Sequence, residues 1–600
     1  MSGVVRWFKS GKAVLTKFKP LTEDAAEDED DQEMVVLPTE TKQQDDEELP
    51  GVFTVEDVVD KLGFGLFQVL LCLFSGSIWV VEAFEVMILS ILSGALKCQW
   101  NLDYAQEATI TMVVFFGFLV GSPIWGTVAD RFGRKKALLT IQVLGFIFGI
   151  ASAFSPNYYV MLLLRGLVGF TIGGGFLGPA YCAEFLPART RAVILCLIQI
   201  SWAVGSVMEA LLALVVMTSI DHEPWRWLLG FSALPLLVVA LVFPLVPESP
   251  RYLIYRGMEE KAKKVLATVA KVNCKSISVG RLVTEEEKER LLKERNQNSV
   301  PTEDVVESVA VETEIDSTTE TTSNGTLPHA RTIETTELTV VSSDNDSDSE
   351  LLLDEDTQKQ DTRRRTLSWS HGKKIVTIKL VSYYRWIQIL FKNGWWKTTL
   401  LLWYLWFAAN IIYYGGTLLT TSLFQHDEHC GLDSNDTNGT DGCKVLTKSD
   451  YIYIMWTTCA EFPGTLWIIV ILLIVGRKKS MAITALLTTV CYGLLFLCLN
   501  QTALTLFLFG VRGFGSGFFQ AIYLYTPEVY PTAVRAIGMA LCSCVSRIGS
   551  MIAPYIAQTL LASNSIATIS LFVIFSLLSA LAALLLPIET KGRAMKDTGG

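Results

Sequence analysis

The sequence predicts an all-α membrane protein whose twelve transmembrane helices form two six-helix bundles related by a pseudo-twofold axis. Two properties of the whole chain predict the membrane: 50% of its 600 residues are hydrophobic, and the mean hydropathy is +0.38. A third observation, the recurrence of charged motifs in both halves of the chain, predicts that the two bundles are copies of one unit.

Twelve apolar runs are long enough to cross a bilayer, for which about 20 residues are needed. Within such a run only a helix satisfies every backbone donor and acceptor. The polar blocks between the runs are therefore expected outside the membrane. The predicted spans are residues 67–96, 107–128, 137–154, 158–182, 193–218, 227–246, 397–424, 451–475, 480–499, 502–525, 537–561 and 566–587.

Lys and Arg in the short connections predict the orientation, because cytosolic loops are rich in these residues. The connections after the second, fourth, eighth and tenth spans carry them, as in RFGRKK, ARTR and GRKK. The connections after the third, ninth and eleventh spans carry none. Both termini are therefore predicted to lie in the cytosol.

The connection after the seventh span is predicted to lie on the opposite side of the membrane. It contains two glycosylation acceptor triplets, at Asn435 and Asn438, which suit that side. The oxidising conditions there also favour a disulfide between Cys430 and Cys443, with two free thiols as the alternative. Cys98 is expected on the same side and is left without an obvious partner.

The spans and the polar blocks divide the chain into five parts. These are a cytosolic N-terminal segment that is partly disordered, a first bundle, a cytosolic linker, a second bundle and a cytosolic tail. Their predicted bounds are 1–66, 67–251, 252–396, 397–587 (which includes the glycosylated loop at 425–450) and 588–600.

The linker contains an acidic insertion at 297–361, rich in Ser, Thr, Asp and Glu. Such a composition buries too little apolar surface to fold, so we expect disorder and a binding site for a cytosolic protein partner. Arginines precede Thr366 and Ser368, which makes both residues candidate phosphorylation sites. An unmodified basic clamp at the membrane surface is the alternative.

Three charged landmarks occur in both halves of the chain in the same order. The motif GRKK begins at 133 and again at 476, an offset of 343. AEFLPARTRA begins at 183 and PEVYPTAVRA at 527, an offset of 344, and the two share a spacing of Glu, Pro, Arg and Ala. Glu248 of PESPR and Glu589 of PIETKGR differ by 341. This nearly constant offset predicts a duplicated six-helix unit, which is an architecture of secondary transporters.

The same motifs resemble signatures of the major facilitator superfamily. GTVADRFGRKK at 126–136 resembles the loop signature of the superfamily, and RGLVGFTIGGG at 165–175 resembles its sugar and organic-ion porters. TVEDVVDKLGFGLFQ at 54–68 and YTPEVYPTAVRA at 525–536 are similar to the branch that includes the synaptic vesicle glycoproteins. The resemblance implies the major facilitator fold, alternating access and a multi-pass protein of the synaptic or secretory vesicle membrane, with the plasma membrane as the alternative.

The sequence departs from that pattern in two places. Leu473 and Ile474 stand where an aspartate and an arginine are expected before the second GRKK, which predicts a second cytosolic gate that is weaker or lopsided. The acidic insertion is not part of the pattern.

The charged motifs at the predicted cytosolic ends are candidates for a gate. Resemblance to the porters implies salt bridges that form when the cavity opens outward and part when it opens inward; loops that only set the orientation are the alternative. Arg165 and Arg512 match in the two halves and are predicted near the cytosolic ends of their helices, bracing their neighbours. The gate set is Asp130, Arg131, Gly133, Arg134, Arg165, Glu184, Arg191, Glu248, Arg251, Arg512, Glu528 and Arg535.

Charged residues inside the spans are candidates for a transport pathway, because an ionised side chain at mid-membrane costs about 2.5–3.5 kcal/mol. Glu82 and Glu85 share one face of the first span by their spacing. Like charge and burial both disfavour ionisation of such a pair. One carboxyl is therefore expected to hold a proton, which suits a proton-coupled carrier or a site for a cation. A helix-packing pair bonded to its neighbours is the alternative.

Four more polar residues complete the predicted pathway: Glu209, Asn410, Glu461 and Arg547. Asn410 lies in the aromatic stretch WYLWFAANIIYY, which either lines a cavity or lies at the membrane interface. Arg547 either neutralises a glutamate or binds an anionic substrate. Because the glutamates favour a cation, the charge of the substrate stays open.

The sequence therefore predicts a secondary transporter that moves a small organic ion across the lipid bilayer by alternating access, with protons as the candidate coupling ion. A non-transporting vesicle membrane receptor or scaffold, with its partner on 297–361, is the alternative. Metal-ligand spacing, a nucleotide-binding loop and a nucleophile paired with a base are not recognisable in the sequence. We therefore expect no enzyme activity, no cofactor, no metal and no nucleic-acid partner.

Overall fold

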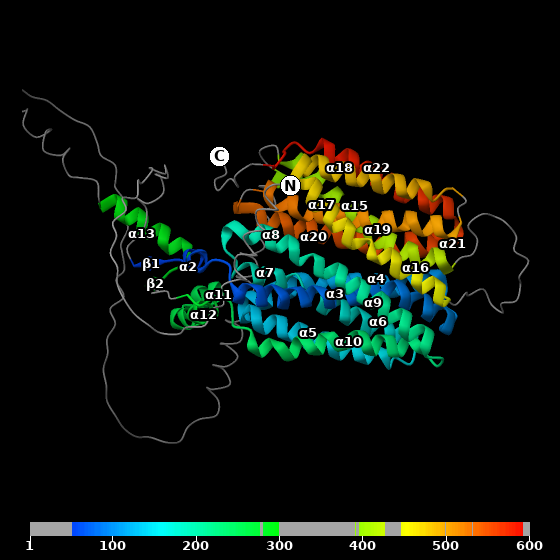
Figure 1. The fold of residues 1–600 in the computed structure, drawn as a ribbon, viewed down its shortest axis with the longest axis horizontal. Helices are drawn as coiled ribbons and strands as arrows, with labels where there is room; N and C mark the ends of the chain where they lie inside the picture. The colour runs from blue at the N-terminus through cyan, green and yellow to red at the C-terminus, as the bar shows by residue number, and fades with distance from the viewer. Residues whose placement is uncertain are drawn as a thin grey trace, which may run out of the picture. The chain divides into compact units, whose positions relative to one another are not determined.

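The computed structural model describes residues 51–275, 280–298, 390–391, 395–425, 446–497, 500–530 and 532–591 (Figure 1). Cys98, for which the sequence offered no partner, is disulfide-bonded. Several predictions concern residues that the structure does not describe: the glycosylation sites Asn435 and Asn438, the Cys430–Cys443 pairing, the phosphorylation sites Thr366 and Ser368, and nearly all of the insertion at 297–361.

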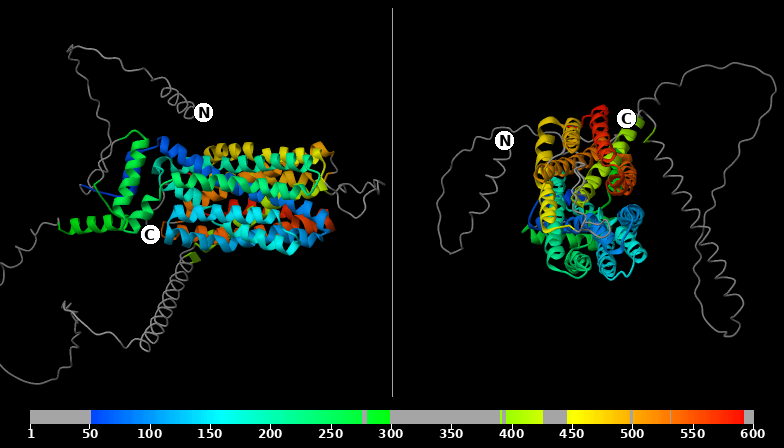
Figure 2. Two further views of the ribbon diagram at one scale, coloured as in Figure 1. Left: turned by 90° about the horizontal axis from the view of Figure 1, so that it is seen from below. Right: turned by 90° about the vertical axis from the view of Figure 1, so that its right-hand side faces the viewer.

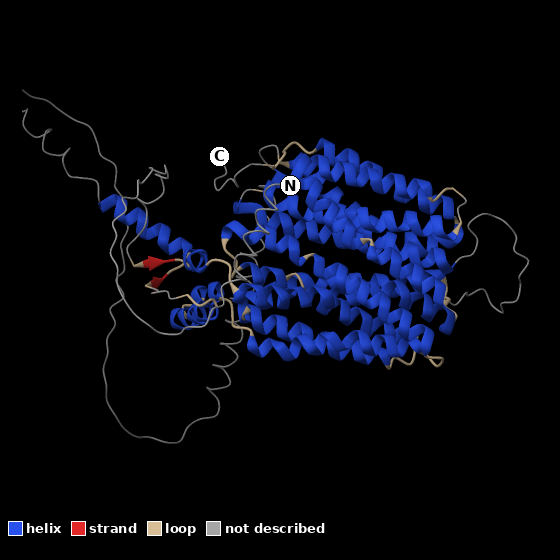
Figure 3. Ribbon diagram, viewed as in Figure 1, coloured by secondary structure: helices blue, strands red, loops and turns tan. Residues whose placement is uncertain are grey.

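Almost all of the described residues are helical (Figure 3). The six spans of the first half lie together, and three of them are built from two consecutive helices. Their helices are α3 (Leu66–Trp100), α4 (Tyr104–Phe132), α5 (Arg134–Ala153), α6 (Tyr158–Ile172) followed by α7 (Leu177–Ala183), α8 (Ala188–Ile198) followed by α9 (Ile200–Ser219), and α10 (Pro224–Val242) followed by η1 (Phe243–Leu245).

The second half forms a neighbouring group of helices, coloured yellow to red in Figures 1 and 2. The eleventh span of the chain, the fifth of this half, contains a π-helical turn, a feature often found at functional sites. The helices are α15 (Trp396–Gln425), α16 (Lys448–Cys459) followed by α17 (Glu461–Val475), α18 (Arg477–Leu494), α19 (Gln501–Val529), α20 (Thr532–Pro554) followed by η2 (Tyr555–Leu560) and α21 (Leu561–Ser563), and α22 (Ser565–Leu585).

All twelve predicted spans have a helical counterpart among the described residues. Within the described ranges, ten helical segments are long and apolar enough to cross a membrane. The other two spans are α15, which carries Thr, Tyr and Asn side chains along its length, and α18, which begins with Arg-Lys-Lys. Both lie inside the second half, where α15 packs against α20 and α18 packs against α22.

Glycines allow the helices of each half to approach closely. A Cβ atom on Gly117 of α4 would overlap the carbonyl oxygen of Gly166 on α6. The second half repeats this contact, since a Cβ on Gly464 of α17 would overlap the carbonyl oxygen of Gly513 on α19. Close approach through small residues is a common basis of helix packing in membranes, and here it occurs at matching places in the two halves.

The charged motifs lie at one end of the helices, where α4 ends and α5 begins; we call it the charged end and the opposite one the far end. In the first half, Arg134 Nε lies 3.5 Å from Glu184. In the second half, Arg477 donates to both oxygens of Glu528, at 3.1 and 3.0 Å. The two halves therefore use equivalent ion pairs, as the duplication predicts.

A second pair of equivalent contacts fixes the turns before α5 and α18. Gly133 and Gly476 have φ angles of 109° and 94°, in the region that favours glycine. The carboxylate of Glu248 accepts a hydrogen bond at 3.0 Å from the N–H of Lys135, and Glu589 accepts equivalent bonds at the start of α18. Each glutamate thus caps the positive end of a helix dipole.

A small folded unit lies beyond the charged end. Two short parallel strands, β1 (Val52–Phe53) and β2 (Arg281–Leu282), pair with each other. The buried apolar faces of α2 and α12 share one core with the nearby helices. The helices of the unit are α2 (Val55–Leu62), α11 (Pro250–Tyr255), α12 (Glu259–Val272) and α13 (Glu285–Asn298).

Candidate functional site

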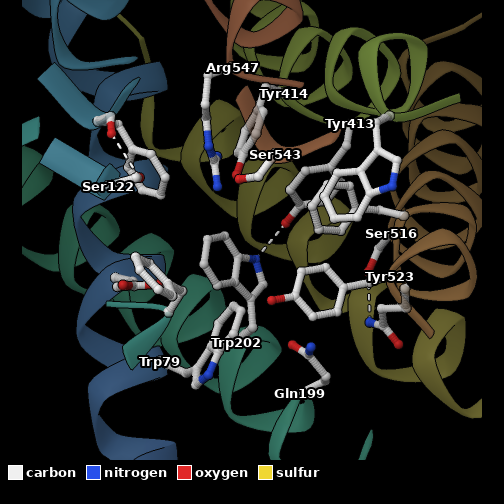
Figure 4. A pocket seen from close by; sticks show the side chains of 16 residues that line it. Trp79, Ser122, Gln199, Trp202, Tyr413, Tyr414, Ser516, Tyr523, Ser543 and Arg547 are labelled. Carbon is white, nitrogen blue, oxygen red and sulfur yellow. Dashed lines mark hydrogen bonds between the residues drawn. The ribbon is translucent and has the colours of Figure 1, made fainter. Parts of the chain in front are cut away.

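A cavity lies between the two halves of the chain (Figure 4). It encloses about 810 Å³ of empty space, a figure that includes the open solvent at its mouth, and about 80 Å³ of this can hold the centre of a water molecule. Nine of the 16 residues that line it are aromatic. The lining residues are Trp79, Glu82, Phe118, Ser122, Phe176, Gln199, Trp202, Trp406, Tyr413, Tyr414, Ser516, Phe519, Gln520, Tyr523, Ser543 and Arg547.

Glu82 reaches this cavity from the middle of α3. Its carboxylate lies against Gly175, in the turn between α6 and α7, where a Cβ atom would overlap Oε1. The side chain is only 7% exposed, and Oε1 is buried with no hydrogen-bond partner among the described residues. A buried polar atom without a partner is costly.

Arg547 enters the same cavity from α20. Its guanidinium carbon lies 3.6 Å from the centroid of the Phe118 ring on α4, a cation–π contact between the two halves. Nε and Nη1 are buried and donate no hydrogen bond to another described residue. Figure 4 shows the side chain beside Tyr414 and Ser543, with the guanidinium pointing into the cavity.

Glu85, one turn further along α3, is held in a buried ion pair. Both terminal nitrogens of Arg165 on α6 donate to its Oε2, at 3.0 and 3.1 Å. The side chains of the pair are 2% and 1% exposed. Glu209 on α9 is buried nearby, with the hydroxyl of Ser232 on α10 at 2.8 and 2.9 Å from its two oxygens. Both carboxyls therefore have partners within the first half.

The second half holds its own buried ion pair, and this one reaches across to the first half. Nη2 of Arg512 donates to Oε1 of Glu461 at 2.8 Å, and the hydroxyl of Tyr413 donates to the same oxygen at 3.0 Å. Nε1 of Trp202, on α9, donates to the Tyr413 hydroxyl at 2.7 Å (Figure 4). Arg512 also lies 3.6 Å from the sulfur of Met87 on α3. The Glu461–Arg512 pair therefore contacts the cavity wall through Tyr413 and contacts the first half through Met87.

The prediction that Arg165 and Arg512 lie near the charged ends of their helices is wrong. Their helices begin at the far end, at Tyr158 and Gln501, and each arginine follows about two to three turns later. Each guanidinium is buried against a carboxylate in the interior of its bundle. Neither residue therefore lies with the other gate charges.

Two of the six residues predicted for the pathway line this cavity, Glu82 and Arg547. Three more are in the buried contacts described above: Glu85, Glu209 and Glu461. Asn410 is fully buried and faces α20, where Ser550 donates to its Oδ1 at 2.9 Å. The aromatic stretch around Asn410 does supply cavity walls, but the asparagine itself fixes helix packing.

The sequence reasoning missed most of the aromatic wall contributed by the first half. Trp79 lies one turn before Glu82 on α3, and its ring meets that of Trp202 edge to face at 5.4 Å between centroids. The spacing of three residues from Glu82 was a usable signal for Trp79. Gln199 and Trp202 lie at the break between α8 and α9, which no sequence pattern marked.

Hydrogen bonds join the two halves at the far end. Gln558 of η2 donates to Ser93 of α3 at 2.9 Å and to Glu107 of α4 at 3.2 Å. Thr559 donates to the backbone oxygen of Tyr104 at 3.1 Å. At the charged end, by contrast, no hydrogen bond or ion pair joins one half to the other within the described parts of the chain. Contacts between the halves are therefore concentrated at mid-helix and at the far end.

The gate charges make contacts within their own halves. Arg134 lies 2.8 Å from Asp130, one turn earlier in the chain. Arg191 and Arg251 both bind Glu56 of α2, at 2.7 and 2.8 Å. Glu56 is a residue that sequence reasoning did not assign to the gate.

The second half differs where the sequence departs from the family pattern. Leu473 and Ile474 are exposed at the end of α17, so an equivalent of the Asp130 contact is missing there. Arg535 of the second half lies 3.4 Å from the carbonyl oxygen of Tyr530. In the first half, the side chain of Arg131 is exposed. A weaker or lopsided second gate stays a prediction.

Comparisons with known proteins agree with this architecture. Residues 78–310 match the family model of sugar (and other) transporters, and residues 454–598 match that of the major facilitator superfamily. The synaptic vesicle 2-related protein of Rattus norvegicus is 38% identical over 553 residues, which cover 91% of this chain and 83% of that protein. The organic cation/carnitine transporter 7 of Arabidopsis thaliana is 34% identical over 555 residues, 91% of this chain and 96% of that protein.

Solved structures show the same fold. The inward-open conformation of the xylose transporter XylE from E. coli aligns with 88% of this chain and 98% of its own, with a TM-score of 0.56. The identity is 15%, so this likeness concerns the fold alone.

Proposed function

The chain belongs to the major facilitator superfamily of membrane transporters, and from this premise we propose that it carries a small organic ion by alternating access, with protons as the coupling ion. Its relatives and its fold are those of transporters and not of enzymes. The substrate, the coupling and the membrane in which it works are the parts of this proposal that go beyond family membership.

The cavity between the halves is the observation that carries the proposal. It is lined by both halves at mid-helix, as a rocking mechanism around a central site requires. The hydrogen bonds of Gln558 and Thr559 join the halves on one side of it. A transporter needs such contacts to form and break in turn at the two ends, so that the cavity is accessible from one side at a time.

The buried pair of Glu85 and Arg165 supports proton coupling. A buried ion pair is stabilised only while both charges are present, and removing one partner typically costs 3–5 kcal/mol. A proton that binds Glu85 would release Arg165 and change the contact between α3 and α6. The pair can therefore couple proton binding to the arrangement of helices behind the cavity wall.

The names of relatives support the substrate class and the location. One relative is named as an organic cation/carnitine transporter and another as a synaptic vesicle 2-related protein. We propose by analogy that this chain handles an organic ion in a synaptic or secretory vesicle membrane, with the plasma membrane as the alternative.

The Glu85→Gln variant tests the coupling. Glutamine fits the same space but cannot gain or lose a proton, so we expect uptake driven by a pH gradient in liposomes to fall to background. Glu260→Gln on α12 is the matched control, because its side chain is 81% exposed and far from the cavity in the fold; its uptake should equal that of the unmodified protein. Proton-driven uptake at the normal rate in Glu85→Gln would refute the role of this carboxyl.

A further inference from the structure

We propose that the cavity selects a zwitterion, a small molecule with an alkylated ammonium group at one end and a carboxylate at the other. The inference rests on the proposed transport function and names the substrate class of the same cavity. It assigns the ammonium group to Glu82 and the carboxylate to Arg547.

The other carboxyls of the predicted pathway already have partners within the protein. Each is buried and lies within hydrogen-bond distance of a donor from another helix. These contacts are Glu85 with Arg165, Glu209 with Ser232, and Glu461 with Arg512. Glu85 and Glu461 each have an arginine as counter-charge, and Glu209 has a hydrogen-bond donor.

Glu82 and Arg547 are different, since both face the cavity and no ion pair joins them in the described structure. Oε1 of Glu82 and two nitrogens of Arg547 are buried without hydrogen-bond partners in that part of the chain. Oε2 of Glu461 and two nitrogens of Arg512 are too, but those residues form an ion pair with each other and do not line the cavity. A simple cation would satisfy Glu82 but would add positive charge near Arg547, and a simple anion would do the reverse. A molecule that carries both charges satisfies both side chains at once, and buried charges need such pairing.

The wall beside Glu82 favours an alkylated ammonium group over a primary one. Trp79 lies one turn from Glu82 and meets Trp202 edge to face. Aromatic faces attract alkylated ammonium groups through cation–π contacts. A primary ammonium carries three donors, and an aromatic wall offers few acceptors for them.

The surroundings of Arg547 suit a carboxylate. A guanidinium offers paired N–H donors that match the two oxygens of a carboxylate. Figure 4 shows the hydroxyls of Ser543 and Tyr523 at the same cavity, where they can add hydrogen bonds. The stacking of Arg547 on Phe118 holds the guanidinium in place before a ligand arrives.

Calorimetric binding to the purified full-length protein in detergent tests the assignment with matched probes. The probes are two trimethylammonio carboxylates of different length (glycine betaine and γ-butyrobetaine), the cationic methyl ester of each, and the anionic isostere of each in which a carbon atom replaces the nitrogen. We expect one of the zwitterions to bind about tenfold or more tightly than its own ester and its own isostere, because each lost charge contact leaves a buried group unpaired.

Two variants assign the two ends of the ligand. Glu82→Gln should weaken binding of that zwitterion and its ester about tenfold or more and leave the isostere unchanged; Arg547→Gln should weaken the zwitterion and the isostere and leave the ester unchanged. Glu260→Gln and Arg281→Gln are the charge-matched controls, at exposed positions outside the membrane helices, and should leave every affinity unchanged.

The probe series on the unmodified protein keeps the test independent of how the variants fold. Tighter or equal binding of an ester or an isostere, or no binding of either zwitterion, would overturn the assignment. Binding in detergent requires no transport, so a protein that binds the zwitterion and fails to carry it would contradict the proposed function and leave this inference standing.

Discussion

At the scale of single residues, the position of the Glu82 carboxylate depends on the absence of a side chain at Gly175. A Cβ atom there would occupy the place of Oε1. We therefore expect Gly175→Ala to displace the carboxylate and to weaken zwitterion binding about tenfold, as the loss of one charged contact does. Calorimetry with the trimethylammonio carboxylates measures this effect.

Gly230→Ala is the matched control for that substitution. Gly230 lies within α10, and a Cβ atom placed on it meets no other atom within 4 Å. Alanine in place of a helical glycine stabilises by about 0.5–1 kcal/mol, so binding should be unchanged and the unfolding temperature should rise slightly. If Gly175→Ala binds as tightly as Gly230→Ala, the ligand does not contact Glu82.

The two glutamates of α3 show what could and could not be predicted at this scale. Their spacing correctly indicated that Glu82 and Glu85 share a face, and both line one smaller cavity beneath that face. The expectation that one of them holds a proton came from the same spacing. The structure gives them different neighbours, because α6 and the turn after it bring Arg165 to one and Gly175 to the other. Contacts between helices are not encoded in local spacing.

At the scale of elements, α2 connects the N-terminal segment to the gate charges. Its residue Glu56 binds both Arg191, after the fourth span, and Arg251, after the sixth. Asp57 of the same helix binds Lys288 of α13 at 2.7 Å. These bonds and the apolar core shared with α12 hold the small folded unit against the charged end.

The attachment of α2 should depend on pH through Glu56. Burial favours the protonated carboxyl, but the hydrogen bond from Arg191 and the charge of Arg251 outweigh it and hold the pKa of Glu56 below its ordinary value of 4.5. Since the pKa is lower in the folded unit, the stabilisation is complete above about pH 4.5 and is lost as the pH falls through the lowered pKa. The protection of the α2 amides, taken relative to the intrinsic exchange rate at each pH, should therefore stay constant from neutral pH down to that value and fall below it.

Variants at neutral pH separate Glu56 from its neighbour. Glu56→Gln should lose about 1 kcal/mol of attachment, which is about a fivefold increase in the rate of amide exchange in α2. Burial raises the pKa of the Glu285 carboxyl, and the charge of Glu56 raises it further. The charge of Arg251 lowers it, by less than burial raises it. Glu285→Gln removes an unfavourable charge, so exchange should not quicken. Equal effects of the two substitutions would contradict the assigned role of Glu56.

The helical spans could be predicted well, whereas the small unit could not. Apolar runs of membrane length leave the chain no choice but a helix. The unit depends on contacts between β1 and α2 and a segment more than 200 residues later, such as the pairing of Val52 of β1 with Arg281 of β2. The apolar positions of VEDVVDKL have helical spacing, but strands of two residues carry no pattern. Its existence therefore could not be inferred from the order of spans.

At the scale of the whole molecule, the duplication predicted from the motifs recurs in three dimensions. The pair of Arg134 and Glu184 has its equivalent in Arg477 and Glu528. The two intramembrane pairs are less alike: Arg165 binds a glutamate of the first span of its half, whereas Arg512 binds Glu461 in the second span of its half. Constant offsets along the chain reveal shared architecture, and they do not reveal where the copies have diverged.

In the proposed mechanism the two halves rock about the cavity that Glu82 and Arg547 line. Double electron–electron resonance on the protein in lipid nanodiscs tests it most directly. One pair of spin labels would be placed at Phe132 and Ile474, exposed at the charged end, and a second pair at Phe154 and Leu497, exposed at the far end. Distances would be compared between neutral and acidic pH, with and without a trimethylammonio carboxylate. We expect reciprocal changes, with one pair approaching as the other separates; distances that do not change, or that change together in the same direction, would contradict the rocking motion.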